Sequence, residues 1–220
     1  MSWEKLLPLL WSNALETLYM TLTSSLIAYI IGLPLGVLLV ITRKSSICPA
    51  PTFNAVLGAV INFLRSIPFI IMLALLFPVT RAIVGTAIGT NAIIFPLVIS
   101  AFPYIARMVE GSLDEVDHGI IEAAQSMGST NWQIISKVLL PEAVPSLING
   151  AAISITTILA YTAMASAAGG GGLGALAITK GLNLSDYRVM FSASMVLVAI
   201  VQIITVLGTR LTRALDHKKR

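Results

Sequence analysis

The sequence predicts an all-α polytopic membrane protein with five transmembrane helices. Charged residues make up only 11% of the 220 residues, whereas hydrophobic residues make up 56%. Soluble domains contain about 25% charged residues, because their surface faces water. Several charge-free stretches reach the roughly 20 residues that a helix needs to cross the hydrocarbon core. Runs such as residues 35–41 are apolar without alternation, which favours helices over the strands of a membrane barrel.

The charge-free stretches place the five helices along the chain. Asp, Glu, Lys and Arg are absent from residues 17–42, 82–106, 143–179 and 189–209. Arg65 alone interrupts residues 45–80, so we expect one span there. Within a single transmembrane domain of residues 1–220, the predicted spans are therefore about 14–42, 55–79, 84–106, 143–168 and 189–209.

The first two predicted spans contain a small-residue pair and an isolated charge. Gly32 and Gly36 form a GxxxG pair, and such small faces let helices approach closely in lipid. Packing within the subunit is the favoured interpretation, and a dimer face is the alternative. Arg65 either snorkels to the interface or faces a polar cavity, where an ionisable residue is a functional candidate.

The predicted fourth span carries a mildly polar stripe and ends in a glycine run. The stripe follows helical spacing, so it either lines a pathway or packs against a neighbouring helix. Residues 169–174 formally match the glycine fingerprint of dinucleotide-binding proteins. That fingerprint requires a preceding strand, so we interpret the run as a flexible extracytoplasmic turn. The residues of the stripe are Gly150, Ser154, Thr157, Tyr161 and either Met164 or Ala165.

Polarity rises abruptly between residues 107 and 142, which hold six of the ten acidic residues. Ser112 and Thr130 each precede a Glu or Gln by three residues, as in a helix-capping box. Gly128 is expected to end a helix over 119–127, and Pro141 suits the first turn of the next span. Two short helices over about 35 residues exceed the needs of a connector, which favours a docking surface.

The distribution of basic residues predicts the orientation of the chain. Nine Lys and Arg residues fall on the side of segment 107–142 and the C-terminus, against four on the other side. Because an excess of basic residues marks the cytoplasmic side, we expect the N-terminus outside and the C-terminus in the cytoplasm. The basic tail that includes residues 218–220 is either a topology determinant, the favoured interpretation, or a contact for anionic membrane lipid.

The chain offers no enzymatic chemistry of its own. It lacks the G-x-x-x-x-G-K-[ST] loop that binds ATP phosphates, and Asp117 and His118 have no nucleophile partner for a triad. Two His and one Cys are too few for a metal site. The basic residues are scattered without interleaved aromatics, which argues against nucleic acid as a partner. We therefore expect no catalytic residue, cofactor or metal in this chain.

One motif in segment 107–142 resembles the EAA loop of ABC-type importer permeases. Glu122-Ala123-Ala124 is followed by Gly128 and then by Val138-x-Leu140-Pro141. The resemblance implies a cytoplasmic coupling helix that docks on a partner ATPase. The alanines leave room for a partner, and Gly128 permits a left-handed turn. The implied coupling residues are Glu122, Ala123, Ala124, Gly128, Leu140 and Pro141.

The chain resembles methionine importer permeases along nearly its whole length. Residues 65–70, 103–110 and 161–164 carry this resemblance, together with the glycine run. It implies a homodimer in the bacterial inner membrane that imports methionine, D- or L-. The implied partners are two ABC ATPase subunits, which bind ATP with magnesium and hydrolyse it, and an extracytoplasmic methionine-binding protein. This chain is then a transport subunit and not an enzyme.

Two alternatives remain open for the function. Polar amino-acid permeases share the EAA loop, so an importer of another small amino acid, cystine-like or polar, is the first alternative. A channel or a structural membrane subunit is the second, and the acidic EAA-like loop argues against it. A mostly apolar pathway would suit a zwitterion with an uncharged side chain. The candidate pathway residues are Tyr161, Met164, Ser166 and Arg65.

Overall fold

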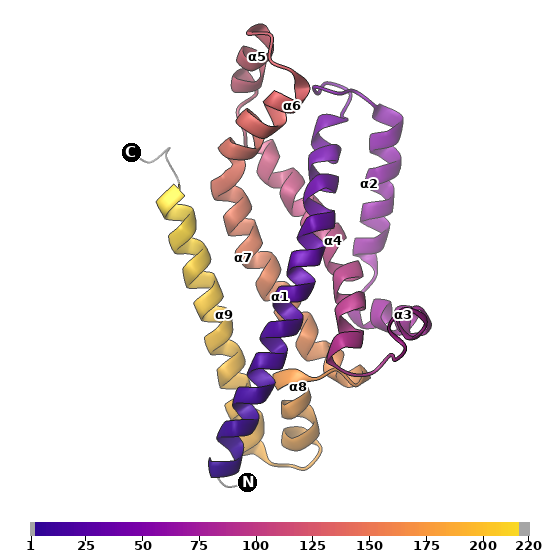
Figure 1. Ribbon diagram of the computed structural model, residues 1–220, viewed down its shortest axis with the longest axis vertical. Helices are drawn as coiled ribbons and strands as arrows, with labels where there is room; N and C mark the ends of the chain where they lie inside the picture. The colour runs from indigo at the N-terminus through magenta and orange to yellow at the C-terminus, as the bar shows by residue number, and fades with distance from the viewer. Residues whose placement is uncertain (1–2, 216–220) are drawn as a thin grey trace. The chain divides into compact units, whose positions relative to one another are not determined.

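The computed structural model describes residues 3–215, and the elements assigned in this range are all helices, which confirms the all-α class (Figure 1). The long helices are α1 (Trp3–Ile41), α2 (Pro51–Ser66), α3 (Phe69–Val84), α4 (Thr90–Asp114), α7 (Leu140–Ala165) and α9 (Tyr187–Leu215). The short elements are α5 (His118–Ser126), α6 (Asn131–Ile134), η1 (Ile135–Leu139), η2 (Ser166–Ala168), α8 (Gly172–Leu176) and η3 (Ala177–Leu182). The basic tail at 218–220 lies outside the described residues.

Four helical stretches of the described chain are long and apolar enough to cross a membrane. Helices α2 and α3 meet the same criteria only together, as a bent pair that is either a broken span or a re-entrant loop. The structure therefore supports four or five spans, and the span predicted at 55–79 is not one continuous helix. The four stretches are α1, α4, the continuous run Asn131–Ala165, and α9.

Pro68 explains the break between α2 and α3. Proline lacks an N–H donor, and its ring disfavours helical backbone at the preceding residue. Helix α2 accordingly ends at Ser66, and Pro68, with φ −56° and ψ 139°, is the N-cap of α3. The sequence contained this signal, but the long apolar run on both sides of the proline suggested a single helix.

Helix α4 lies later in the chain than the span predicted at 84–106. Gly85 and Gly89 have positive φ angles of 84° and 101°, a backbone conformation that favours glycine, and the helix begins only at Thr90. It then continues past Arg107 to Asp114. The charges at this end are paired with residues of other elements, which spacing in the sequence does not reveal.

The chain divides into two compact units, which we describe separately. The first unit comprises the N-terminal residues up to Ala28, Ile67–Ala101 and Ser154–Val206. The second unit comprises Tyr29–Ser66, Phe102–Ile153 and the residues from Leu207 onward.

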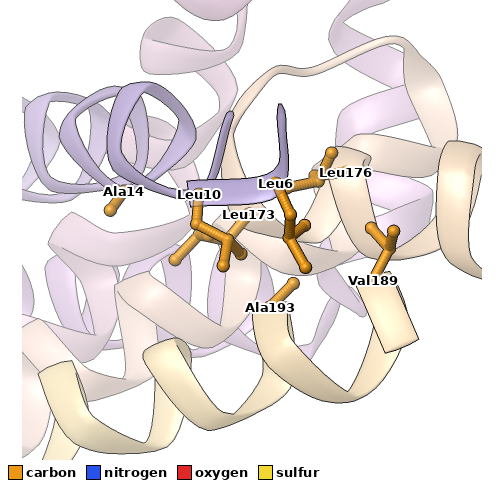
Figure 2. Close-up of a cluster of buried hydrophobic side chains, with 7 residues drawn as sticks. All are labelled: Leu6, Leu10, Ala14, Leu173, Leu176, Val189 and Ala193. Atoms are coloured by element: carbon orange, nitrogen blue, oxygen red, sulfur yellow. The ribbon is translucent and has the colours of Figure 1, made fainter. Parts of the chain in front are cut away.

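An apolar cluster holds the first unit together (Figure 2). It joins the first turns of α1 to α8 and to the start of α9, so segments more than 150 residues apart in the sequence share one core. Because apolar surface gains little by leaving lipid, close packing contributes more to such a core than hydrophobicity does. Its buried members are Leu6, Leu10, Ala14, Leu173, Leu176, Val189 and Ala193.

The glycine run packs tightly within the first unit, which corrects the expectation of a flexible turn. The N–H of Gly172 donates a hydrogen bond to the carboxylate of Glu16 at 2.9 Å. A Cβ atom on Gly174 would lie 2.5 Å from the Cα atom of Ala163, so only glycine fits there. Close approach of backbone to backbone therefore accounts for glycine at this point.

The GxxxG pair of α1 packs against α4 within the second unit. A Cβ atom on Gly32 would lie 2.8 Å from a side-chain atom of Ile105. A Cβ atom on Gly36 would lie 2.6 Å from the carbonyl oxygen of Ala106. Both glycines thus serve contacts inside one chain, which confirms the favoured interpretation over the dimer face.

A π-helical stretch precedes Pro141. The N–H of Leu140 bonds to the carbonyl of Ile135, five residues earlier, so the helix is locally wider in η1. Proline clashes with the carbonyl of an ordinary helical turn, and a widened turn accommodates it. Pro141 lies in the first turn of α7, as predicted, but the chain before it is already helical.

Candidate functional site

Helix α5 begins at Asp117. The Asp117 carboxylate accepts a hydrogen bond from the N–H of Gly119 at 2.7 Å, and its charge also favours the helix N-terminus. The cap predicted at Ser112 is wrong, because Ser112 is buried within α4. There its hydroxyl accepts a hydrogen bond from Ser146 at 3.1 Å.

Gly128 closes the C-terminal end of α5 in a left-handed conformation with φ 78°. The N–H of Gly128 donates to the carbonyl of Gln125 at 2.9 Å, and the N–H of Ser129 donates to that of Ala124 at 3.1 Å. Together these two bonds form a Schellman motif, the usual way in which glycine ends a helix. The predicted end of this helix is confirmed.

Thr130 starts α6 with the predicted capping box. Its hydroxyl accepts a hydrogen bond from the N–H of Gln133 at 3.3 Å, and the Gln133 side chain accepts one from the N–H of Thr130 at 2.8 Å. The turn between α5 and α6, whose place in the chain Figure 1 shows, is fixed by hydrogen bonds on both sides. We call residues 117–134 the α5–α6 segment.

The α5–α6 segment exposes apolar side chains that the motif did not include. Met127 is 80% exposed and Trp132 is 73% exposed, on either side of the turn. Large apolar side chains on the surface of a polar segment are typical of an interaction site. Sequence reasoning followed the motif and missed both, although they flank Gly128 and the Thr130 cap.

The structure places the six predicted coupling residues in three different settings. Glu122 and Ala123 are exposed on α5, whereas Ala124 is buried and faces the protein. Gly128 forms the turn, where a Cβ atom would meet nothing within 4 Å. Leu140 and Pro141 lie beyond η1, half-buried and exposed respectively, and so are separate from the turn.

A charge cluster of Arg43, Arg107, Glu110 and Asp114 lies at the end of α4 in the second unit. Arg43 donates to the two carboxylate oxygens of Asp114 at 2.7 and 2.9 Å, and to Glu110 at 2.6 Å. Arg107 donates to the other oxygen of Glu110 at 2.6 Å and to the carbonyl of Gly58 at 2.9 Å. The cluster thus joins α4 to α2 and to the loop that contains Arg43.

Burial differs between the members of the charge cluster. The side chains of Glu110 and Arg107 are 13% and 22% exposed, whereas those of Arg43 and Asp114 are 39% and 41% exposed. Salt screens exposed ion pairs more than buried ones, so the contact between Glu110 and Arg107 is less sensitive to salt than the contact between Asp114 and Arg43. Hydrogen bonding to the Asp114 carboxylate raises the pKa of the Arg43 guanidinium above its ordinary value.

The α1–α2 loop, residues 42–50, also contacts the start of α6. The side-chain amide of Asn131 donates a hydrogen bond to the sulfur of Cys48 at 3.0 Å. A pocket of about 210 Å³ separates part of the loop from α5, with His118 and Glu122 among its lining residues. Small-molecule sites are larger, from about 300 Å³ upward, so the pocket is a gap between packed segments.

Three of the candidate pathway residues lie at the end of α7 and in η2, in the first unit. Tyr161 stacks on Phe69, with ring centroids 4.7 Å apart and an interplanar angle of 2°. Met164 is 46% exposed, and Ser166 is buried and donates to a backbone carbonyl. Arg65 is exposed in the last turn of α2, in the second unit, so the structure does not group it with the other three.

Comparison with known proteins identifies the class. The chain belongs to the family of binding-protein-dependent transport system inner membrane components, whose pattern matches residues 32–220. It is therefore a multi-pass permease subunit of a transport system.

Similar proteins include methionine permeases. The chain is 45% identical over 210 residues to the probable D-methionine transport system permease protein MetI of Vibrio cholerae, with 96% of this chain and 93% of that protein covered. It is 48% identical over 160 residues to the D-methionine transport system permease protein MetI of Escherichia coli (strain K12), with 71% of this chain and 74% of that protein covered. Its fold matches a solved inward-facing conformation of the MetNI methionine ABC transporter with a TM-score of 0.96 at 45% identity, covering 99% and 100% of the two chains.

Proposed function

We propose that this chain is the permease subunit of an ATP-driven ABC importer that carries methionine into the cytoplasm. The observation that supports this proposal most is similarity to a methionine permease along 96% of the chain at 45% identity. The fold similarity to MetNI, with a TM-score of 0.96, agrees with it.

The proposal requires partner chains. Two copies of the permease form the pathway, and two ATPase subunits bind ATP with magnesium and hydrolyse it, because this sequence has no phosphate-binding loop. A methionine-binding protein delivers the substrate on the outside, in keeping with the description of the family as binding-protein-dependent. The excess of basic residues supports an outer N-terminus and a cytoplasmic C-terminus.

In this proposal the α5–α6 segment is the cytoplasmic coupling element. Its exposed Met127 and Trp132 supply apolar contact area, and exposed Glu122 supplies charge toward a basic partner. The caps at both sides of the turn favour transmission of force, because a turn with fixed backbone moves as a unit. Ala124 acts by allowing close packing of α5, while Leu140 and Pro141 extend the element into α7.

The proposed pathway runs beside the end of α7. Tyr161 and Met164 lie on this helix and Ser166 follows it, in surroundings that carry few charges. Such surroundings suit methionine, a zwitterion with an uncharged thioether side chain. Arg65 remains a candidate from α2.

Transport by the reconstituted complex tests the proposal. The permease, its ATPase and its binding protein are placed in proteoliposomes, and uptake of labelled L- and D-methionine is followed with ATP inside or outside. We expect ATP-dependent accumulation that unlabelled methionine competes away and cystine does not. A complex with a hydrolysis-deficient ATPase serves as the control. Preferential uptake of cystine would support the alternative importer, and uptake without the ATPase would support a channel.

A further inference from the structure

The α1–α2 loop contacts the chain just before the α5–α6 segment and again at the start of α6. Near one end, Arg43 binds Asp114, three positions before the Asp117 cap of α5. At the other end, Cys48 accepts a hydrogen bond from Asn131, the first residue of α6. We propose that this loop positions the coupling segment, with Arg43 as its principal positioning residue; the inference rests on the coupling role proposed above.

The loop has its own framework of hydrogen bonds, which a positioning element requires. The amide of Asn54 donates to the carbonyl of Leu39 at 2.6 Å and to the hydroxyl of Thr42 at 2.9 Å. The N–H of Ala50 donates to the carbonyl of Thr42 at 3.0 Å. These bonds join the end of α1 to the start of α2, so the backbone that carries Arg43 is held in place.

Little chain separates the Arg43 contact from the coupling helix. Only Glu115 and Val116 lie between Asp114 and the Asp117 cap, and Val116 is buried. The N–H of Val116 also bonds to the carbonyl of Leu113 at 3.2 Å, which ties the residues after α4 to its last turn. A displacement of α5 is therefore passed to Asp114 and through Arg43 to the α1–α2 loop.

The geometry of the contact requires arginine. Arg43 binds Asp114 through two parallel hydrogen bonds and reaches Glu110 with one of the same nitrogens. A planar guanidinium makes such bidentate contacts, whereas the ammonium of lysine is a point charge. The cluster of two Arg and two acids is neutral overall, so loss of Arg43 leaves a surplus negative charge beside the carboxylate of Glu110, which is 13% exposed.

The test compares Arg43→Ala with Lys44→Ala, its exposed neighbour, in the complete complex. We expect methionine transported per ATP hydrolysed to fall by about 3- to 10-fold in Arg43→Ala, the scale of coupling changes caused by single substitutions. ATPase activity in the absence of binding protein should stay unchanged, as should all values of Lys44→Ala. Arg43→Lys keeps the charge but loses the bidentate contact, so it should recover only part of the lost coupling.

Hydrogen–deuterium exchange provides a readout that does not depend on the substrate. Peptides from residues 117–134 should exchange about 3- to 10-fold faster in the Arg43→Ala complex than in the Lys44→Ala complex. Unchanged exchange, or parallel loss of complex assembly and of both activities, would overturn the positioning role. Failure of the unaltered complex to transport methionine would instead overturn the proposed substrate, and the exchange result would still decide the role of the loop.

Discussion

In the first unit, backbone approaches backbone across glycine residues, and one apolar cluster joins the start of α1 to α8 and to the start of α9. In the second unit, the GxxxG pair makes similar close contacts, but α4 is also joined to α2 and to the α1–α2 loop by charged hydrogen bonds. Contacts of the first kind depend on shape and are insensitive to salt. Contacts of the second kind are directional and depend on charge.

This difference matches the roles proposed for the two units. The α5–α6 segment, for which we propose docking on a moving partner, belongs to the unit with the charge cluster. Tyr161, Met164 and Ser166 belong to the unit in which close packing dominates. Directional contacts can break and re-form as a segment moves, whereas a close-packed core allows only discrete arrangements.

The largest expected effect is that of Gly174→Val in the first unit. The added Cβ atom would lie 2.5 Å from backbone of Ala163, which cannot give way as a flexible side chain would. Overpacking costs about 1–3 kcal/mol and occasionally more. We expect a marked fall in the unfolding temperature of the purified complex. Gly111→Ala is the control, because its Cβ atom would meet nothing within 4 Å; equal unfolding temperatures for the two variants would refute the packing argument.

The next effect concerns coupling in the second unit. Glu122→Lys reverses an exposed charge, and Gly128→Val places a β-branched residue at φ 78°, which costs about 1–2 kcal/mol or more. We expect both variants to insert normally and to lose substrate-stimulated ATPase activity. Gly128→Asn is the control, since asparagine tolerates this conformation and should retain stimulation. Normal stimulation in both variants would argue decisively against the proposed docking segment.

Glu110→Gln tests the charge cluster directly. The substitution removes the charge that pairs with both Arg43 and Arg107 but keeps an amide oxygen that can accept a hydrogen bond, so the expected cost is about 1.5 kcal/mol. Amide exchange should rise in peptides near residues 43–58 and 102–114 and stay unchanged near 163–176. Added salt should accelerate exchange less in the variant than in the unaltered protein. Equal changes in both units would show that the second unit does not depend more on charge than the first.

The smallest effect is expected for Thr130→Ala. The variant loses the hydroxyl that accepts from Gln133, and removal of such a cap costs about 1 kcal/mol. Faster exchange should be confined to the start of α6, with little change in unfolding temperature. Thr130→Ser keeps the hydroxyl and should behave like the unaltered protein. A global loss of stability would show that the cap supports more than its own turn.

Local signals in the sequence predicted the parts of the structure that depend on neighbouring residues. Gly128 and Thr130 determine the turn between α5 and α6 through bonds that span three to five positions. The scarcity of charges predicted the apolar helices for a similar reason, because the length of an uncharged run is itself local. Pro68 was also a local signal, and weighing it against the apolar run would have located the break.

Long-range pairing explains what could not be predicted. Helix α4 continues to Asp114 because its charges meet Arg43, 71 positions earlier in the chain. Ser112 matched a capping pattern but is buried against Ser146. The glycine run has the composition of a flexible turn, but contacts with Glu16 and Ala163 hold it in place. Each of these outcomes depends on which helices become neighbours.

The position of α1 in these contacts has a consequence for biosynthesis. Arg43 leaves the ribosome 67 residues before Glu110, and Glu16 leaves it 156 residues before Gly172. Chains are synthesised from the N-terminus, so in both units the earlier partner is already present when the later one emerges. The first helix and the loop after it therefore form a template on which the later helices assemble, and a change there disturbs assembly before any substrate is bound.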